Sequence, residues 1–600
     1  MLDSHLRLAR ASRRYHIRAL QAHFSTRGGR LVREGEPRLL AEAAALGVVG
    51  ALAAQLFTWA LRLCTHLFLI WFAGYHPPGL PAEGGVLRQS IGSHGLWLIP
   101  VATTIGGLIS GFLVYSFAPE AEGHGTDTVV KAFHRAGGFI RARVAPLKLV
   151  ASAITIGSGG SAGREGPTAL IGAGVGSIYA TLFHRNDQER SYLVLMGMAA
   201  GLSAIFRSPI GAAFFAVEVL YGNMEFESGA LLYTMLAGVV AYGVNGWFVG
   251  WKPLFFFPEG QSHLSAPGYA WFGVLGVAGG LIATLLPVVF YRLRDAFRAL
   301  PIPPAFNPAI GGLGVGLLAL KFPQLLGGGY GWIQEAIYGQ IAVKLLFILI
   351  FLKILAFALT VSSGGSGGVF APTLFVGAML GGFLASLVHL PSAAFVVVGM
   401  LAVFGAAARV PIAALVMVTE MTGGYQLLPA ATFAVLVSYL VQTNLSGGLK
   451  YHSLYEAQVL GRAQSPARYV ENVQLALRLL GTRKIPKAAK IGHLDLVALL
   501  DSGIPVKIPG RKELNLGVLK PESSLVGKTI QDCYNAARNA ALEIIGIVRG
   551  GEILLPAPAT ILQPNDRLLI IGSTEARADL SEHIAPFVPS PPGQTPNRAA

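Results

Sequence analysis

The residues of this chain that are best suited to chemistry lie in the segment GREGP, residues 163–167. Arg164 and Glu165 are the only charged residues between Lys148 and His184. An ionisable side chain in so apolar a stretch is costly unless it faces a cavity or a partner, so it indicates a functional site. The glycines interrupt one helix and the proline suits the first turn of the next, which predicts a helix start with free backbone N–H groups.

Free N–H groups at a helix start bind anions. We therefore expect an anion site that includes Gly163, Arg164 and Gly166. The carboxylate of Glu165 is an anion tethered at the same place, so it would compete with a diffusible anion, and protonation would release it. A structural ion pair between Arg164 and Glu165 at a helix interface is the alternative interpretation.

The same pattern occurs a second time in the chain. Residues 158–176 read SGGSAGREGPTALIGAGVG and residues 363–381 read SGGSGGVFAPTLFVGAMLG, with ten of nineteen positions identical at an offset of 205. Phe370 stands in the place of Glu165, so the second helix start would offer its amides without a competing carboxylate. The candidate ligands there are Gly368, Val369, Phe370 and Ala371.

A second pair of similar segments supports a duplication. FRSPIGAAFFAVEVLYG and ARVPIAALVMVTEMTGG repeat at an offset of 202, which aligns Glu218 with Glu420. Two motifs in the same order indicate a duplicated unit of about 200 residues. If the repeat is inverted, the two opposed helix starts form a site of positive dipole for a small anion, with no buried lysine.

The elements that must position these motifs are membrane helices. Charged residues make up 13% of the 600 residues and AVILMFWYC residues 53%, which excludes a multidomain soluble, disordered or fibrous protein. We predict an all-α polytopic membrane protein with an inverted-topology repeat and broken re-entrant helices. The predicted full-length spans are 39–75, 96–117, 230–250, 271–291, 342–361 and 427–445. Segments too short or too glycine-rich to cross as ordinary helices are 146–157, 167–183, 209–221, 369–387, 395–407 and 411–420.

The charge distribution suggests the domain order. Residues 1–38 carry nine arginines, typical of a cytoplasmic arm before a first span, so the net charge of +15 indicates no nucleic-acid partner. We expect a multi-pass cell membrane protein with both termini in the cytoplasm and without a metal site. The predicted domains are a basic arm at 1–38, a membrane domain at 39–460 with repeats at 39–250 and 268–460, a linker or irregular subdomain at 461–513, a cytoplasmic α/β domain at 514–585 with strands at 542–548 and 567–571, and a disordered tail at 586–600.

The repeated motifs resemble the signatures of the CLC chloride channels and proton-coupled chloride exchangers. GREGP and GVFAP at 368–372 match this family, as do SPIGAAFFAVE and VPIAALVMVTEMT. The resemblance implies transport of chloride by a homodimer with a pore in each subunit, with no enzymatic activity and no cofactor. It implies that Glu165 is the gate and that Val369 and Phe370 bind the anion through their backbones. Tyr455, in Ser453-Leu454-Tyr455, would be the hydroxyl that closes the inner side, or else an interfacial aromatic.

Two positions depart from the family pattern. The usual GSGIP reads Gly123-His124-Gly125-Thr126-Asp127 here, so His124 replaces a serine that meets the anion. An imidazole can donate an N–H to an anion or carry a proton, although His124 can also be a loop residue with neither role. Val219 replaces the internal proton glutamate, and its neighbour Glu218 is then better explained as a structural residue. Proton-coupled exchange and a passive gated channel both remain open. Fluoride export is less expected, because Tyr455 and GREGP are retained.

The C-terminal segment resembles the RCK-C or TrkA-C module. The matching residues are SSLVGKTI at 523–530, IIGIVRGGEILLPAPATIL at 544–562 and NDRLLIIGS at 565–573. The resemblance implies dimerisation and the binding of a small anionic or nucleotide ligand, with a ligand-free dimerisation module as the alternative.

One enzymatic alternative exists in the second repeat. Residues 364–367 read GGSG, a pattern found at the nucleophile of intramembrane serine proteases. Ser366 would be the nucleophile and His389 the base. A serine in a glycine-rich run is a weak signal, so transport is the preferred interpretation.

Overall fold

The computed structural model describes residues 36–258, 266–462, 465, 506–508, 512–530, 532, 542–549, 552–554, 559–572 and 584–586. Two compact units divide the chain, and each is described by itself: residues 1–133 with 137–458, and residues 134–136 with 459–600. Most of the predicted basic arm, linker and tail lies outside the described residues.

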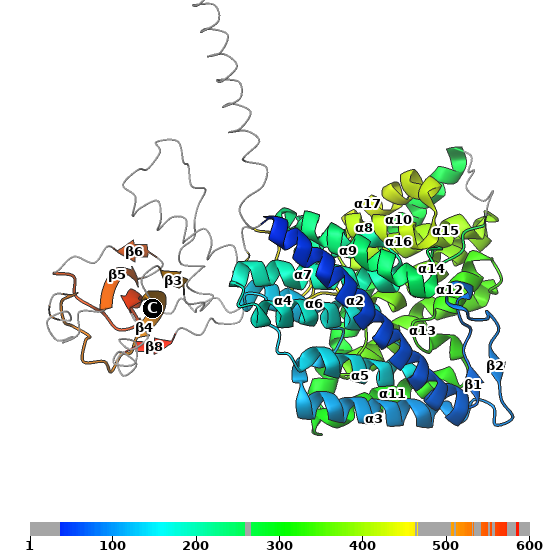
Figure 1. The fold of residues 1–600 in the computed structure, drawn as a ribbon, viewed down its shortest axis with the longest axis horizontal. Helices are drawn as coiled ribbons and strands as arrows, with labels where there is room; N and C mark the ends of the chain where they lie inside the picture. The colour runs from blue at the N-terminus through cyan, green and yellow to red at the C-terminus, as the bar shows by residue number, and fades with distance from the viewer. Residues whose placement is uncertain are drawn as a thin grey trace, which may run out of the picture. The chain divides into compact units, whose positions relative to one another are not determined.

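The α-helices of the membrane unit form two successive sets, one in each half of the chain (Figure 1). The first half contains α2 (Glu36–Thr65) with its extension η1 (His66–Phe72), α3 (Ile99–Phe117), α4 (Thr126–Arg135), α5 (Val144–Gly157), α6 (Glu165–Leu182), α7 (Asp187–Phe206), α8 (Pro209–Glu218) and α9 (Ser228–Val249). The second half contains α10 (Ala266–Arg298), α11 (Asn307–Ala319), α12 (Tyr330–Ile337), α13 (Val343–Ser362), α14 (Phe370–Val388), α15 (Ser392–Ala407), α16 (Pro411–Thr422) and α17 (Leu428–Ser446).

Short elements connect the helices. The hairpin β1 (Tyr75–His76) and β2 (Ser90–Ile91) follows α2 and encloses the turn η2 (Pro81–Glu83). Further single turns are η3 (Pro119–Ala121), η4 (Pro304–Phe306), η5 (Pro323–Leu325) and η6 (Tyr425–Leu427).

The two halves are related by an inverted repeat. Gly163 pairs with Gly368 in an isolated antiparallel bridge, and these residues are counterparts at the offset of 205. A residue that pairs antiparallel with its own counterpart lies on a local two-fold axis. The predicted all-α fold with an inverted repeat is therefore confirmed.

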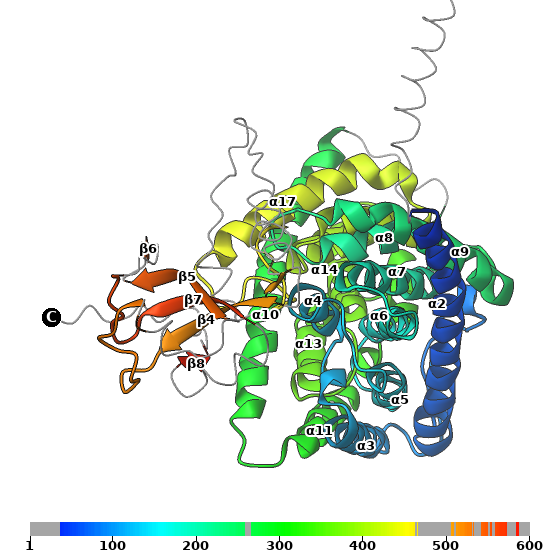
Figure 2. The same cartoon turned by 60° about the vertical axis from the view of Figure 1, so that its left-hand side comes forward.

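Glycines let the helices of each half approach closely. A Cβ on Gly172 of α6 would overlap the carbonyl oxygen of Gly197 on α7, and a Cβ on Gly377 of α14 would overlap that of Gly399 on α15. The same contact thus recurs in both repeats. Figure 2 shows α6 beside α7, and α3 beside α11 where the halves meet. Small residues at such crossings allow close backbone packing in membranes.

Seven helices among the described residues are long and apolar enough to cross a membrane. They cover Pro37–Phe72, Ile99–Phe117, Ser228–Val249, Gly268–Arg298, Val343–Ser362, Phe370–Val388 and Tyr425–Ser446. Six overlap the predicted spans. The prediction that 369–387 is too short or glycine-rich to cross is wrong, because α14 is an unbroken helix of 19 residues. The prediction also omitted α7, which opens with charged residues that mask its apolar remainder.

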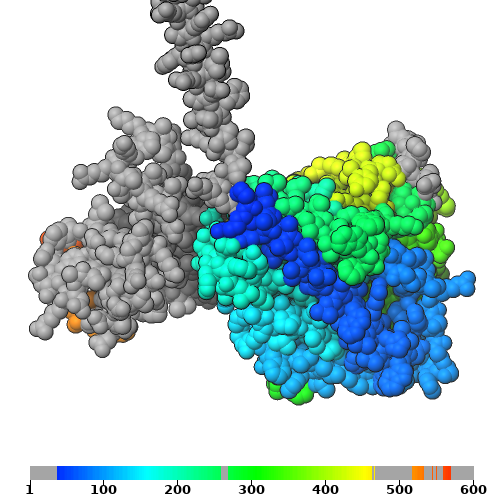
Figure 3. Space-filling view, in the orientation of Figure 1, coloured from blue at the N-terminus to red at the C-terminus, as the bar shows by residue number. Residues whose placement is uncertain are grey.

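The outer surface of the membrane unit is apolar. Large side chains of α2, among them Leu56 and Trp59, and Trp71 of η1 are exposed, and Figure 3 shows α2 lying across this face. Exposed apolar surface of this extent suits contact with lipid rather than water.

The second unit contains a six-stranded sheet. Its strands are β3 (Val506–Ile508), β4 (Lys512–Leu519), β5 (Leu542–Arg549), β6 (Glu552–Leu554), β7 (Arg567–Gly572) and β8 (Ile584–Pro586). They follow the order β3-β4-β7-β5-β6, with β8 also paired to β4, and every described pairing is antiparallel. The predicted strands at 542–548 and 567–571 are confirmed.

The boundary of this unit corrects one prediction. β3 and the first residues of β4 fall in the segment 461–513, for which the prediction was a linker or irregular subdomain and not part of the sheet. A strand of three residues between prolines gives too short a pattern to recognise. Inside the unit, Arg549 holds the buried Asp566 through two hydrogen bonds of 2.8 and 2.7 Å.

Candidate functional site

The site forms where α6 and α14 begin. Gly163 N–H donates to the carbonyl of Gly368 at 2.8 Å, and Gly368 N–H donates to that of Gly163 at 2.7 Å. These two bonds tie together the loops that precede the helices, so the N-termini of α6 and α14 meet. Each N-terminus carries free amides and the positive end of a helix dipole.

Glu165 lies between these two helix starts. Its Oε1 accepts a hydrogen bond of 2.8 Å from the backbone N–H of Ala371, in the first turn of α14. Its other oxygen, Oε2, is buried without a hydrogen-bond partner among the described residues, and the residue is only 3% exposed. The sequence predicted that this carboxylate occupies an amide site at a helix start. The structure adds that the amide belongs to the opposite repeat.

Glycines make the space for the carboxylate. A Cβ on Gly163 would overlap both carboxylate oxygens of Glu165, and a Cβ on Gly368 would lie 2.6 Å from Oε1. Gly166 lies against the carbonyl oxygen of His124 in the same way. Gly163 and Gly368 therefore leave room for the carboxylate of Glu165, and Gly166 leaves room for the backbone of His124 beside it.

The other predicted residues of the second repeat are also buried at this place. Val369 precedes the first turn of α14, and the ring of Phe370 packs against Phe206 at 4.6 Å and Phe404 at 4.3 Å between centroids. The rings wall the site with apolar surface. A carboxylate or a small anion in such a place depends on backbone amides for its stabilisation.

His124 and Tyr455 lie together next to this seat. Their ring centroids are 5.3 Å apart in an edge-on arrangement. His124 is 6% exposed, and its Nε2 lies 3.3 Å from Oδ2 of Asp127. Asp127 is itself held by the backbone N–H of Ala457 at 3.1 Å.

Arg164 does not reach the seat of Glu165. Its guanidinium forms an ion pair with Glu83 of η2, and it lies 5.0 Å from the ring centroid of Tyr330. The alternative interpretation of a structural Arg164–Glu165 pair is therefore not what the structure contains. The guanidinium of Arg164 is therefore engaged elsewhere, and only the backbone of Arg164 remains for the predicted role of anion ligand.

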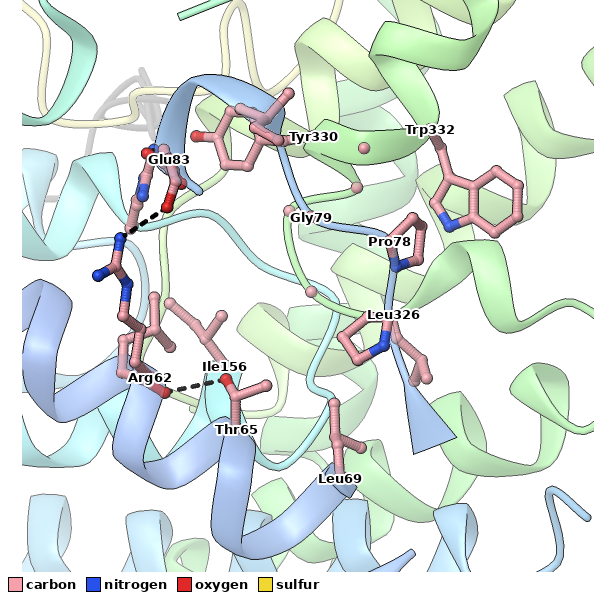
Figure 4. A pocket seen from close by; sticks show the side chains of 18 of the residues that line it. Arg62, Thr65, Leu69, Pro78, Gly79, Glu83, Ile156, Leu326, Tyr330 and Trp332 are labelled. Carbon is pink, nitrogen blue, oxygen red and sulfur yellow. Dashed lines mark hydrogen bonds and ion pairs between the residues drawn. The ribbon is translucent and has the colours of Figure 1, made fainter. Parts of the chain in front are cut away.

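A cavity of about 370 Å³ opens beside Arg164 (Figure 4). Arg62, at the end of α2, donates to the backbone carbonyl of Glu83 at 3.3 Å, and Arg207 donates to that of Ala82 at 2.8 Å. Three arginines from separate elements thus hold the turn η2 at the edge of this cavity. Burial alone would raise the pKa of the Glu83 carboxyl, but Arg164, with Arg207 and Arg62, holds it below the usual glutamate value.

Two buried lysines flank the site, and they correct the expectation that none is present. Lys148 on α5 and Lys353 on α13 are both 0% exposed and are counterparts at the offset of 205. Each ammonium donates to two backbone carbonyls of the loop before a short helix. The bonds of Lys148 go to Ala121 at 3.0 Å and Gly123 at 2.6 Å, and those of Lys353 go to Leu325 at 2.9 Å and Gly327 at 2.8 Å. The two ammonium groups thus bind loop carbonyls and not Glu165 or Ala371.

Glu218 and Glu420 cap each other's helices. Glu218, at the end of α8, accepts from Ala413 N–H at 2.6 Å in the first turn of α16. Glu420, on α16, accepts from Gly211 N–H at 2.9 Å in the first turn of α8. A carboxylate at a helix N-terminus is favourable. These bonds support the structural interpretation of Glu218, and the neighbouring Val219 is completely buried.

The protease alternative is wrong. Ser366, just before α14, shares a hydrogen bond of 2.8 Å with Ser152 and donates to the carbonyl of Ala121 at 3.1 Å. His389 follows α14, so the 19 residues of this helix separate it from Ser366. At 1.5 Å per residue that is roughly 28 Å, far beyond proton transfer.

Sequence reasoning missed Glu83 and the two lysines. Glu83 lies 81 residues from Arg164, in a loop whose sequence shows no periodic pattern. The lysines did carry a usable signal, since an unexpected charge recurs at the offset that relates the two halves.

Comparisons with known proteins agree with this geometry. The family model described as "Voltage gated chloride channel" matches residues 106–443, and the TrkA-C domain matches residues 518–585. A "Putative chloride channel protein ClcB-like" of Ralstonia nicotianae is 30% identical over 67% of this chain and 93% of its own length. An "H(+)/Cl(-) exchange transporter ClcA" of Salmonella arizonae is 30% identical over 62% of this chain and 81% of its own length.

The solved structures that match include a CLC-type fluoride/proton antiporter, with a TM-score of 0.60, 25% identity, and coverage of 71% of this chain and 99% of that one. The helical fold, the repeated site and these matches point to one family of membrane transporters, whose members are not enzymes. The chain belongs to the voltage-gated chloride channel (CLC) family and carries a TrkA-C domain toward its C-terminal end.

Proposed function

We propose that this protein carries chloride across the membrane in exchange for protons, with Glu165 as both gate and proton carrier. One observation carries the proposal: the Glu165 carboxylate takes the N–H of Ala371, the kind of donor that a chloride ion would need in this apolar place. An anion and the carboxylate cannot use that amide at once.

The two oxygens of Glu165 suit this exchange. Oε1 is bound to the amide, whereas Oε2 is buried and has no partner among the described residues. A proton on Oε2 removes the charge that holds the carboxylate to the helix start, so the side chain can leave and chloride can take the amide. When the proton leaves, the charged carboxylate returns and displaces the anion.

The cavity beside Arg164 supports an outer approach to the site. Its lining includes Arg62 and Arg164, whose positive charges attract anions toward the mouth. Glu83 offsets part of that charge, so anions are attracted without being trapped.

Purified protein in liposomes tests the proposal. With a chloride gradient imposed and a small counter-ion conductance supplied, we expect chloride to drive protons uphill, recorded as a change of external pH. Glu165→Gln should abolish proton movement and change the chloride flux. A Glu165→Gln protein with wild-type flux of both ions would contradict the assignment of Glu165.

A passive gated chloride channel is the second candidate. It is favoured by Val219, an apolar residue at the place where exchangers of this family carry an internal proton acceptor, and by Glu218, which is occupied as a helix cap. Downhill chloride flux without chloride-driven proton movement in the wild type would select the channel. Fluoride export is less favoured, since GREGP and Tyr455 are retained, and a flux assay with fluoride in place of chloride separates the two.

We further propose that the protein is a homodimer with one pore in each subunit. Exposed apolar side chains on α8 and α9, which pack together, and on α17 support this, among them Ile210, Leu232 and Leu440. Light scattering of the protein in detergent should give twice the mass of one chain.

The TrkA-C domain is proposed to bind a small anionic or nucleotide ligand on the cytoplasmic side, with both chain termini in the cytoplasm of the cell. Thermal unfolding with and without nucleotides tests the ligand, and protease digestion of intact spheroplasts tests the orientation.

A further inference from the structure

Proton exchange requires that protons reach Glu165 from the side away from the outer cavity, and a titratable side chain there could pass them on. Glu218 is committed to the N-terminus of α16, and Val219 cannot titrate. The cluster of His124, Asp127 and Tyr455 lies on none of the elements that line the cavity. It contains a titratable residue whose backbone lies beside the seat of Glu165, because the carbonyl of His124 packs on Gly166.

The surroundings of His124 decide which ring nitrogen is free. Nε2 lies 3.3 Å from the Asp127 carboxylate, an acceptor, so the neutral ring keeps its hydrogen on Nε2. Nδ1 then has a lone pair and no hydrogen. It is buried and has no hydrogen-bond partner among the described residues. In this state Nδ1 repels an anion and accepts a proton.

Protonation reverses the property of the same nitrogen. With a proton on Nδ1, the ring becomes an imidazolium whose Nε2–H still donates to Asp127 and whose Nδ1–H can donate to an anion. Proton uptake and anion binding would therefore share one ring edge. The carboxylate of Asp127 supplies the opposite charge that a buried imidazolium requires.

The other charged and titratable groups near His124 are compatible with this role. On α5, the ammonium of Lys148 opposes the imidazolium but is directed at the carbonyls of Ala121 and Gly123. Tyr291 on α10 donates to the carbonyl of Leu454, and the positive charge of Lys131 on α4 acts on Asp127. Asp127 is the group in ion-pair contact with the ring.

The cluster also connects the site to water. The side chain of Asp127 is 15% exposed, whereas that of His124 is 6% exposed. The ring centroid of Tyr455 lies 5.3 Å from that of His124, and His124 contacts Asp127 at 3.3 Å. The cluster thus links the partly exposed carboxylate of Asp127 to the buried ring of His124.

We infer that His124, positioned by Asp127, is the inner proton acceptor of this transporter and binds the anion through the same ring edge once protonated. The inference rests on the proposed exchange. A proton from water forms the Nδ1–H bond, and it later leaves Nδ1 for Oε2 of Glu165. Each transfer breaks one bond to hydrogen and forms another, so no further reactant is needed.

The test uses the full-length protein in liposomes, with chloride and proton fluxes recorded together. His124→Ser restores the hydroxyl usual at this position, and Asp127→Asn keeps the acceptor for Ala457 while removing the charge. His389→Asn is the matched control, because this distant histidine has a φ of 54°, which asparagine tolerates. We expect the protons moved per chloride to fall at least about tenfold in His124→Ser, severalfold in Asp127→Asn, and not at all in His389→Asn.

The outcomes separate the two claims. If the wild type moves no protons against their gradient, the proposed exchange fails, and this inference fails with it. If the wild type exchanges and His124→Ser keeps the wild-type ratio, only the inference is overturned. A thermal unfolding temperature in detergent close to that of the wild type shows that a variant is folded.

A second measurement decides the matter even if these variants fail to fold. In the Glu165→Gln protein the gate cannot take a proton, yet chloride binding should still draw one onto His124. Adding chloride to this protein in unbuffered detergent solution near neutral pH should therefore make the solution more alkaline. No change of pH, with chloride binding verified by calorimetry, would overturn the inference.

Discussion

The backbone N–H of Ala371 donates to the carboxylate of Glu165 at 2.8 Å, so a carboxylate of one repeat occupies the helix N-terminus of the other. The antiparallel pair of Gly163 and Gly368 brings these two residues together. In the proposed function, this relationship lets a chain with few charged residues hold an anion within its membrane unit. Amides and helix dipoles would provide the positive potential, and the carboxylate of Glu165 would fill the place when the anion is absent.

The glycines at the seat should not tolerate alanine. In Gly368→Ala the new Cβ would lie 2.6 Å from Oε1 of Glu165 and 2.8 Å from Gly166 N, so the carboxylate must leave its amide. Overpacking of this kind costs about 1 to 3 kcal/mol. We expect chloride flux to change at least about tenfold by misplacement of the gate. Gly243→Ala on α9 is the control, since its Cβ would meet no described atom within 4 Å. Equal fluxes in both variants would argue against the tight seat.

The reciprocal caps should contribute to stability and not to transport. Glu420→Gln keeps an acceptor for the amides of α8 but loses the charge, which should lower the stability by about 1 to 2 kcal/mol. Glu218→Gln should behave alike at α16. Thermal unfolding in detergent measures the loss, and the liposome assay should return the wild-type ratio of protons to chloride. A changed ratio in Glu218→Gln would show that this residue takes part in proton transfer.

The buried lysines should stabilise the loops whose carbonyls they bind. Lys353→Met fits the apolar surroundings but leaves the carbonyls of Leu325 and Gly327 without their donor. Each unsatisfied buried carbonyl costs about 1 to 3 kcal/mol, so we expect a clear fall in the unfolding temperature. Lys344→Met, on the exposed face of the same helix, should change it little. If the two variants were equally stable, the bonds of Lys353 would not be holding the loop.

The pair of Glu83 and Arg164 should make stability depend on acid pH. Because the pKa of Glu83 is lowered in the folded protein, its contribution is complete above the ordinary glutamate pKa of about 4.3 and is lost as the pH falls through the lower folded value. Glu83→Gln should therefore reduce stability by about 2 kcal/mol near pH 7 and by less in acid. Unfolding temperatures between pH 3 and about 7 measure the difference.

The exposed pair of Arg141 and Glu120 gives the matched control for this experiment. Both side chains are 39% exposed, and exposed pairs contribute about 0 to 1 kcal/mol. Glu120→Gln should therefore leave the stability near that of the wild type. A difference between wild type and Glu83→Gln that does not shrink in acid would contradict the role of the Glu83 charge.

The sequence predicted the centre of the site well because two independent patterns coincide there. The isolated charge of Glu165 marks a costly group, and the offset of 205 identifies Gly368 as the counterpart of Gly163. An inverted repeat places such counterparts on its axis, where they can pair. The seat of Glu165 on Ala371 follows from that symmetry.

The surroundings of the site could not be predicted in the same way. Arg164 forms an ion pair with Glu83, which lies in a distant loop. The partners of Lys148 are backbone carbonyls, which every residue possesses. Such contacts depend on the packed fold and leave no mark in residue type or spacing. The contact between His124 and Asp127 could not be predicted either. The two residues are three positions apart across a loop and a helix start, and such a segment can bring the side chains together or direct them apart.

The central claim is that chloride and the Glu165 carboxylate compete for the N–H of Ala371, and anomalous diffraction from bromide tests it most directly. Crystals of Glu165→Gln soaked in bromide should show an anomalous peak in contact with Ala371 N–H. In wild-type crystals at high pH, the carboxylate should occupy that position and the peak should be weak or absent. A bromide peak beside Ala371 together with Glu165 still bound to the same amide, or no peak there in Glu165→Gln, would contradict the account.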